Sequence, residues 1–297
     1  MIPSLAGMLK AAPAPGEPFD ITDMILHHLV DGPYWETPFG KLYLPQFEPV
    51  QIGPLLIDFS ITRHVMAMIV AASAVAIVMI LAARGAAREQ ASGAGRGPKG
   101  AANVVEAAIL FVRDEIALKN IGHGGERFVP YIVTVFFFIL FCNLLGLIPW
   151  GATATGNISV TAALAIMTLA MVEYAGMREL GFKGYMHTIF YAPPGLPTAM
   201  KIPMYIIMTP VEFLGKLTKP FALAIRLFAN MTAGHALVLA LTGLLVVATT
   251  ANVFWVIPAP LFMAVAIMVL EVFIAFIQAY VFSVLSSVFI GLIRHAH

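Results

Sequence analysis

The chain has 297 residues, of which 60% are hydrophobic and 11% are charged, and its formal net charge is +1. Soluble globular domains are roughly 45–50% apolar and about 25% charged, so one aqueous core cannot bury this many apolar side chains. A mean hydropathy of +0.89 excludes a soluble enzyme, a nucleic-acid-binding protein and a disordered tail. The single cysteine, Cys142, excludes an intrachain disulfide and a CxxC metal or redox site. The composition therefore predicts an integral membrane protein.

The first sixty residues differ from the rest of the chain. Residues 1–16 lack the basic start and unbroken apolar run of a secretory signal, so we expect no cleaved leader. Residues 17–60 hold seven carboxylates and a single lysine among turn-forming and aromatic residues. We predict an extended extramembrane flap of turns and short strands over residues 1–60, followed by one membrane domain over residues 61–297. No further ligand stands at usable spacing from His27–His28, so we expect no metal site in the flap.

The first apolar run and the stretch after it differ in character. An uncharged run of about nineteen residues predicts a membrane helix over residues 64–83, long enough to cross the bilayer with little tilt. The next stretch, 84–127, begins as a Gly/Ala-rich linker and then mixes charges with apolar residues at roughly helical spacing. We interpret it as an amphipathic helix on the cytoplasmic surface. Its apolar positions are Val104, Ala107, Ala108, Phe111, Ile116 and Leu118.

Two further uncharged runs predict a membrane hairpin. The second helix covers residues 128–149 and ends at Pro149–Trp150. After a short polar turn, the third helix begins near residue 159 and reaches Glu173–Arg178.

Lysine and arginine counts predict the orientation, because positive residues near helix ends stay on the cytoplasmic side. Seven of them lie in residues 84–127 and three in residues 178–201, whereas the turn 150–158 has none. The acidic flap and the N-terminus are therefore expected outside, in the periplasm, and the C-terminus in the cytoplasm. This arrangement requires an odd number of crossings.

The last hundred residues form two apolar runs that are longer than a crossing needs. The first has about 48 residues before the polar patch Thr249–Asn252 and the second about 40 after it, so as helices they would measure roughly 70 and 60 Å. Either each run folds back or each forms one long oblique helix. Residues 213–248 contain only Pro220 as a breaker, which favours two oblique helices and about five crossings in total. Pro258 and Pro260 are expected to mark the start of the last helix.

Ionisable and amide side chains are rare inside these two runs, and at hydrocarbon depth such groups usually line a path or meet a partner. Arg226 and Asn230 share a helix face, whereas His235, nine residues after the arginine, points to the opposite side. Glu271 and Gln278 share a face of the last helix. The polar residues are Glu212, Lys216, Lys219, Arg226, Asn230, His235, Glu271 and Gln278, and the small residues Ala222, Ala229 and Ala233 border the arginine.

Plainer interpretations of these residues stay open. Arg226 could snorkel to the inner interface if the span covered residues 224–247. His235 and Gln278 could be hydrogen-bonded residues of helix packing. Lys216 and Lys219 favour a position at the membrane–water interface over a role in a mechanism. Glu271, by contrast, lies too deep in its apolar run to be a surface residue.

One segment carries a specific family pattern. Residues 221–235, FALAIRLFANMTAGH, contain small-x-small-aliphatic-Arg-Leu-x-small-Asn and resemble the signature of subunit a of the F-type ATP synthase. Residues 136–165, with their Asn-Leu-x-Gly-x-Ile-Pro sequence, resemble that family's membrane hairpin, and residues 271–286 resemble its last helix. The resemblance covers roughly residues 60–297.

The resemblance implies a non-catalytic subunit that transports protons. In this family two oblique helices lie against a rotating ring of c subunits, and the stator chain supplies two aqueous half-channels that do not meet. Arg226 would sit between the half-channels and hold a ring carboxylate ionised, because a nearby opposite charge favours the charged form. The ring carboxylate must then take up a proton before it returns to lipid, and rotation is coupled to proton flux in this way.

The other site residues follow from the same resemblance. His235 and Glu271 correspond to the imidazole and carboxylate of the family and would relay protons in the outer half-channel. Asn230 and Gln278 would hydrogen-bond around the arginine or line the path. Glu212 and Asn157 are secondary candidates.

The resemblance also implies partners and location. The partners are the c-ring, subunit b of the peripheral stalk and the remaining F1Fo subunits, with membrane lipid around the chain and no nucleic acid. No cofactor is implied, and the absence of a GxxxxGK[ST] loop assigns nucleotide chemistry to other subunits. The expected location is the bacterial inner membrane, as a multi-pass protein.

Three other classes of protein fit less well. A secondary ion- or proton-coupled transporter, the main alternative, also uses intramembrane ionisable residues, but such folds have two similar halves and no internal repeat is evident. An intramembrane hydrolase needs HExxH or paired aspartates, and no aspartate occurs in or after the second membrane run. A purely structural assembly subunit would tolerate a lysine or a neutral residue in place of Arg226.

Overall fold

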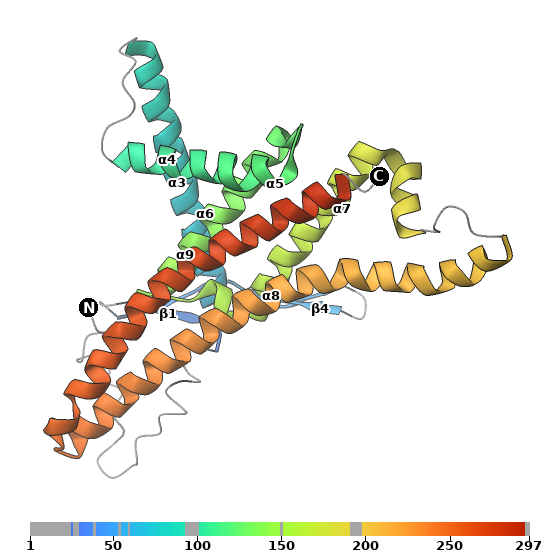
Figure 1. Cartoon of the computed structure of the whole chain (residues 1–297). Coiled ribbons are helices and arrows are strands. Elements are labelled where there is room, and N and C mark those ends of the chain that lie inside the picture. The colour runs from blue at the N-terminus through green and yellow to red at the C-terminus, as the bar shows by residue number, and fades with distance from the viewer. Residues whose placement is uncertain are drawn as a thin grey trace. The chain divides into compact units, whose positions relative to one another are not determined.

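Figure 1 shows a computed structural model of the whole chain. The structure describes residue 25 and residues 30–37, 40–52, 55–58, 60–92, 101–148, 151–190 and 198–294. The expectations for residues 1–16, His27–His28 and Pro149–Trp150 lie outside these ranges.

The chain forms two compact units, each built from separate stretches of sequence. Unit 1 consists of Met1–Ile77, Phe138–Asn157 and Phe228–Gln278, and unit 2 consists of Val78–Phe137, Ile158–Leu227 and Ala279–His297. The division passes through helices, so it does not test the predicted boundary after residue 60.

Within the described residues, five helices are long and apolar enough to cross a membrane. A helix satisfies its backbone hydrogen bonds internally, which hydrocarbon requires of every crossing segment. The helices confirm the predicted all-α membrane fold. They are α3 (Arg63–Ser92), α6 (Val129–Gly146), α7 (Ile158–Ile189), α8 (Thr198–Thr250) and α9 (Pro258–Arg294).

The two long apolar runs are unbroken helices, so the prediction that neither folds back is confirmed. α8 has 53 residues and α9 has 37. α8 continues through Pro203, Pro210 and Pro220, because neighbouring groups can satisfy the backbone groups that a proline frees in a membrane helix. α9 begins at Pro258, as predicted, where the missing N–H forfeits no helical hydrogen bond. The tilt of both helices against a partner stays a prediction.

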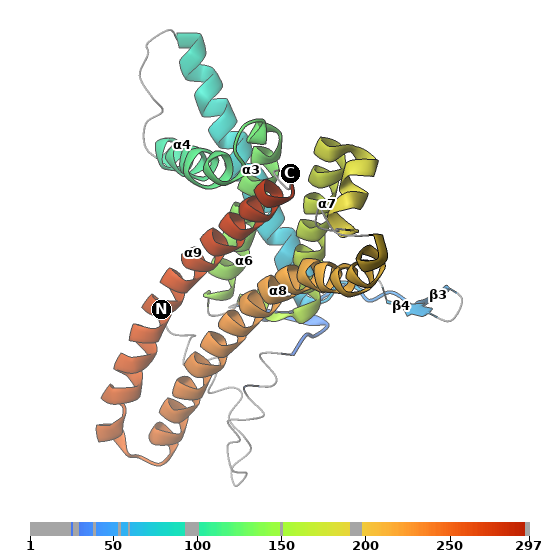
Figure 2. The same cartoon turned by 45° about the vertical axis from the view of Figure 1, so that its right-hand side comes forward.

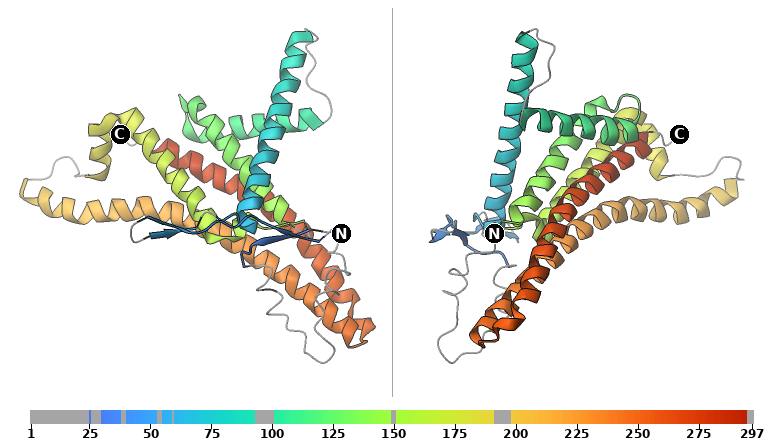
Figure 3. Two further views of the ribbon diagram at one scale, coloured as in Figure 1. Left: turned by 180° about the vertical axis from the view of Figure 1, so that it is seen from behind. Right: turned by 60° about the vertical axis from the view of Figure 1, so that its left-hand side comes forward.

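Unit 1 contains two short antiparallel ladders before α3. β1 (Tyr34–Thr37) pairs with β2 (Gly40–Tyr43), and β3 (Val50–Ile52) pairs with β4 (Leu55–Ile57). Figure 3 shows the strands near the end of α3 at which that helix begins. Short strands and turns were expected here, and their position outside the membrane is still an expectation.

Asp31 ties this segment to the start of α3. Its carboxylate accepts a hydrogen bond from the His64 backbone N–H (3.2 Å) and lies 3.4 Å from Nδ1 of the His64 ring. The Arg63 guanidinium donates to the carbonyl of Val30. A carboxylate at this place satisfies an N–H group that has no partner within the helix. Partial burial raises the pKa of Asp31, but hydrogen bonds with His64 and Thr62 outweigh it and hold the pKa below its ordinary range.

Small side chains allow close packing in the core of unit 1. Ala67 and Ala71 of α3 are buried in one cluster with Cys142 of α6 and with Ala152 and Ala154 of the following turn. Small residues let helix backbones approach closely, which increases dispersion contacts in a membrane protein. The larger side chains around this cluster are Trp35, Met68, Phe138, Phe141 and Leu145.

Unit 2 contains a helix where the amphipathic surface helix is predicted, and its position at a membrane surface stays a prediction. α4 (Ala101–Phe111) continues through the π-helical residues Val112–Leu118 into α5 (Lys119–Ile121). Val104 and Phe111 are exposed, whereas Ile116 is buried. A π turn contains more residues than an α turn, so the α-helical spacing does not continue across it. The buried residues here are Val112, Ile116, Ala117 and Ile121.

Two membrane helices extend beyond their predicted ends. α7 bends at Gly181, which has a φ of 68° and a ψ of 167°, a backbone conformation that glycine adopts readily. The helix then continues to Ile189. α3 runs past residue 83 to Ser92, because the Ala-rich and charged residues after the apolar run are good helix formers.

Candidate functional site

The second part of α8 and the first part of α9 form a hairpin in unit 1 (Figure 2). Asn230 Nδ2 of α8 donates a hydrogen bond to Gln278 Oε1 of α9 at 3.1 Å. Gln278 is buried, with 4% of its surface exposed. The structure therefore brings together two predicted site residues that lie 48 positions apart.

Glu271 is buried against α8. Its side chain is 7% exposed, and its carboxyl group contacts the backbone of Gly234, where an added Cβ would collide with Oε1. Among the described residues, Oε1 of Glu271 has no hydrogen-bond partner. A buried carboxylate is costly in apolar surroundings unless it is paired or protonated. Glu271 is therefore suited to gaining and losing a proton next to His235, the residue that follows Gly234.

His235 faces the polar turn after α6. Its Nε2 lies 3.4 Å from the Oγ1 of Thr153, and the histidine side chain is half-buried. Thr155 of the same turn donates to the Oδ1 of Asn143 at 2.7 Å. Asn143 Nδ2 reaches the carbonyl of Ala275 on α9 at 3.5 Å. The turn thus supplies hydroxyl groups on the side of unit 1 that holds the histidine.

Asn157, a secondary candidate, lies at the end of this turn. Its Nδ2 is 3.3 Å from Nδ1 of His64, the ring that also meets Asp31. Sequence reasoning did not select His64, Thr153 or Thr155. A signal was available for Asn143, which opens the Asn-Leu-x-Gly-x-Ile-Pro sequence, but the others show no local pattern that sets them apart.

Arg226 lies on an exposed face of α8. The small residues Ala222, Ala229 and Ala233 are exposed as well, in agreement with the predicted helical spacing. Ion pairs in the described ranges involve other residues, and none of the carboxylates there pairs with Arg226. An arginine remains protonated, and small neighbours admit another helix. This face is therefore suited to an anionic partner that the chain does not supply in its described part.

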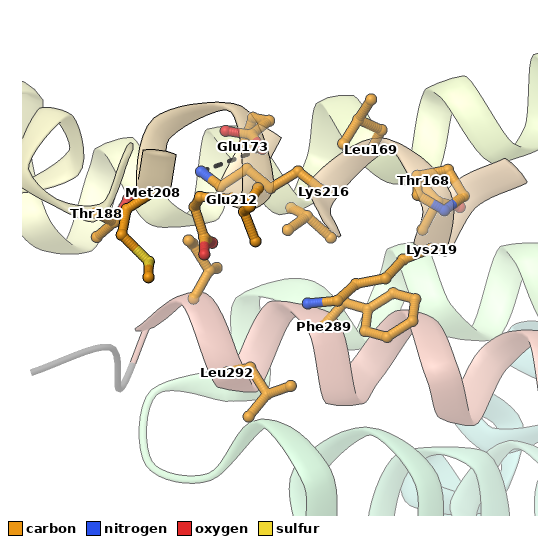
Figure 4. A pocket seen from close by; sticks show the side chains of 14 residues that line it. Thr168, Leu169, Glu173, Thr188, Met208, Glu212, Lys216, Lys219, Phe289 and Leu292 are labelled. Carbon is orange, nitrogen blue, oxygen red and sulfur yellow. Dashed lines mark ion pairs between the residues drawn. The ribbon is translucent and has the colours of Figure 1, made fainter. Parts of the chain in front are cut away.

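Unit 2 contains a cavity of about 280 Å³ between residues of α7, α8 and α9. Figure 4 shows its ionisable side chains, with Lys216 pointing toward Glu173. Lys216 Nζ lies 3.7 Å from Glu173 Oε1 and 3.3 Å from the hydroxyl of Tyr185. Glu212 and Lys219 line the same cavity, and the Lys219 ammonium lies 5.4 Å from the centre of the Phe289 ring. The secondary candidate Glu212 thus lines a cavity that also contains Glu173, Lys216 and Lys219.

The described residues contain no cluster of three or more His, Cys, Asp or Glu side chains arranged to hold a metal ion.

Known proteins with similar sequences are ATP synthase subunits. The family model for the ATP synthase A chain matches residues 65–291. ATP synthase subunit a 2 of Chlorobaculum tepidum is 44% identical over 284 residues, which are 95% of this chain and 74% of that protein. ATP synthase subunit a of Chloroherpeton thalassium is 43% identical over 90% of this chain and 75% of its own length. ATP synthase subunit a of Anaeromyxobacter dehalogenans strain 2CP-C is 43% identical over 92% of this chain and 71% of its own length.

Proposed function

This chain belongs to the ATP synthase A chain family, and from that premise we propose that it is the proton-translocating stator subunit of an F-type ATP synthase. One structural observation supports this role in addition to membership of the family. Arg226 is a permanently charged residue, exposed among small residues on a membrane helix, with no carboxylate partner in the described part of the chain. The partner that fits is a membrane-embedded carboxylate carried by a rotating ring of c subunits.

The charge of Arg226 would couple flux to rotation. A ring carboxylate beside the guanidinium stays ionised, because the opposite charge stabilises the ionised form. Beyond the guanidinium, an ionised carboxylate cannot enter lipid at acceptable cost, so it must first take up a proton. Protons therefore cross only with rotation of the ring.

The outer half-channel is assigned to unit 1. His235 and Glu271 would relay protons, since an imidazole can titrate near neutral pH and the Glu271 carboxyl is buried against Gly234, the residue that precedes His235. The hydroxyl of Thr153 would hold the histidine ring in position. The Asn230–Gln278 hydrogen bond would fix the spacing of α8 and α9 near the arginine.

The inner half-channel is assigned to the cavity of unit 2. Glu212, Glu173 and Lys216 would line a wetted path there. The expected orientation, with the positively charged loops in the cytoplasm, puts the C-terminal end of α9 and this cavity toward the cytoplasmic side.

The remaining assignments follow from the same role. The chain would work with the c-ring, subunit b and the other F1Fo subunits in the bacterial inner membrane, with its N-terminus outside. Each proton moved through 100 mV supplies about 2.3 kcal/mol, so several protons must combine for one ATP, which is made on other subunits.

The test is Arg226→Ala in the intact complex, with ATP-driven proton pumping and passive proton leak measured in sealed vesicles. We expect an assembled complex that no longer pumps and leaks more protons. Arg113→Ala is the matched control, because Arg113 is an exposed arginine beside Asp114 on the surface helix, and pumping should be unchanged. Normal pumping by Arg226→Ala would refute the proposal, and normal pumping by Arg226→Lys as well would indicate a purely structural subunit.

A further inference from the structure

A second cavity in unit 2, of about 350 Å³, is rich in arginine. It lies among the start of α6, the middle of α7 and the last residue of α9. These are ends or late turns of candidate membrane spans, the depth at which lipid headgroups meet a protein. Its polar lining residues are Arg127, Tyr131, Tyr174, Arg178, Glu179 and Arg294.

The charge of this cavity is not balanced. Three arginines face one carboxylate, that of Glu179, so the lining carries a formal charge of +2 (three positive minus one negative). The side chain of Glu179 is 48% exposed and lies 3.1 Å from Arg294 Nη2. One half-exposed carboxylate cannot neutralise three guanidinium groups, so the cavity attracts an anion.

Arg294 is the buried member of the three. Its side chain is 6% exposed, and Nη2 donates to the carbonyl of His123 at 2.9 Å as well as to Glu179. The Nε and Nη1 atoms are buried, and in the described part of the chain they have no hydrogen-bond partner. Gly124, with φ +74°, leaves room for this guanidinium, since an added Cβ would lie 2.9 Å from Nη2. Two of the three guanidinium nitrogens of this buried cation thus have no hydrogen-bond partner among the described residues, although the group also lies 5.8 Å from the centre of the Phe128 ring.

Arg127 and Arg178 are the accessible members. Both are exposed, and Arg178 Nη1 donates to the Tyr174 hydroxyl at 2.6 Å, which orients its guanidinium. Guanidinium forks bind phosphate oxygens in a bidentate way. The apolar side chains of Met171 and Phe128 line the remainder.

We propose that this cavity binds the phosphate group of an anionic phospholipid. Inorganic phosphate has the same headgroup chemistry, but the site lies at the ends of candidate membrane spans, and Phe128, Met171 and Ala175 give it an apolar part. Basic pockets between membrane helices at a membrane surface bind anionic headgroups by this combination of charge and position. The inference does not depend on proton transport.

The experiment uses the full-length chain in neutral detergent, with bound lipid counted by native mass spectrometry. Phosphatidylglycerol is compared with phosphatidylcholine at equal concentration. The wild-type chain is expected to retain phosphatidylglycerol preferentially, and the double variant R127Q/R178Q to bind it about 25-fold more weakly, or roughly fivefold for each arginine. The control R84Q/R113Q removes the same charge from exposed arginines outside the cavity and is expected to change binding by less than about twofold.

Two further arms make the outcome decisive. R127K/R178K keeps the charge, so near-normal retention supports an electrostatic site even if the glutamine variant folds poorly. Inorganic phosphate at millimolar concentration should not displace the lipid, and complete displacement would overturn the lipid assignment in favour of free phosphate. Equal retention of both lipids, or equal loss of binding in the R84Q/R113Q control, would overturn the proposal.

Discussion

Gly234 of α8 and Glu271 of α9 are in direct contact, because the carboxyl group of Glu271 occupies the space where any other residue at position 234 would have its Cβ. The contact brings a buried acid to the backbone of the helix that carries Arg226 and His235. It sets a strict limit on side-chain size at position 234, and that limit is testable.

Gly234→Ala is expected to displace the Glu271 carboxyl and to reduce ATP-driven proton pumping to a small fraction of the wild-type rate. Forcing an extra methyl into a packed contact costs about 1–3 kcal/mol, which exceeds the gain of about 0.5–1 kcal/mol from replacing glycine with alanine in a helix. Pumping in sealed vesicles measures the effect. Gly215→Ala on the same helix is the control, since its added methyl has no neighbour within 4 Å. Equal activity of the two variants would show that the contact does not matter for transport.

The Asn230–Gln278 hydrogen bond is expected to couple α8 and α9 energetically. Asn230→Leu and Gln278→Leu each leave an amide without its partner, and the double variant removes both amides. Interhelical hydrogen bonds of this kind are worth about 0.6 kcal/mol on average and up to about 1.7 kcal/mol. A double-mutant cycle on thermal unfolding in detergent measures the coupling energy. A coupling energy of zero would mean that the two amides act independently.

Lys216→Met is expected to destabilise the chain by about 1–3 kcal/mol, because it leaves the carboxylate of Glu173 buried without its partner. Adding Glu173→Gln should recover most of this loss. The side chains of the pair are only 14% and 21% exposed. Lys119→Met is a suitable control, because the Glu115–Lys119 pair is 57% and 68% exposed and exposed ion pairs contribute little to stability. Equal losses of stability for the two lysine variants would contradict the assignment of Lys216 to a buried pair.

The attachment of residues 30–32 to α3 is expected to persist at acidic pH. The pKa of Asp31 is lowered in the folded chain by its hydrogen bonds with His64 and Thr62, against the opposite effect of burial. A carboxyl pKa that is lower in the folded than in the unfolded chain stabilises the folded chain at pH values above the ordinary aspartate pKa. This stabilisation is lost only as the pH falls below that value. Amide hydrogen exchange at the start of α3 should therefore stay slow at pH 5, and at pH 5 and above it should be faster in Asp31→Asn than in the wild type. An unchanged exchange rate in Asp31→Asn would show that the carboxylate does not hold this segment.

The sequence alone was enough to locate the membrane helices. Each apolar run interacts with hydrocarbon by itself, so its length and its breakers predict a helix without knowledge of its neighbours. The same local logic predicted that Arg226 shares an exposed face with small residues and that α9 starts at Pro258. It did not reveal the π-helical residues Val112–Leu118, which change the helical spacing in a way that composition does not show.

Only the tertiary structure decided which polar groups meet. Gly234 and Glu271 are 37 positions apart in sequence, and Thr153 and His235 are 82 apart. Such pairs depend on how far each helix slides and turns against the next, which is set by the packing of many small side chains at once. The sequence thus determined that this chain carries an arginine, a histidine and an acid within two long apolar helices. The fold decided that the acid lies against Gly234 and that the histidine faces Thr153, because helix register is a property of the packed molecule and not of any one segment.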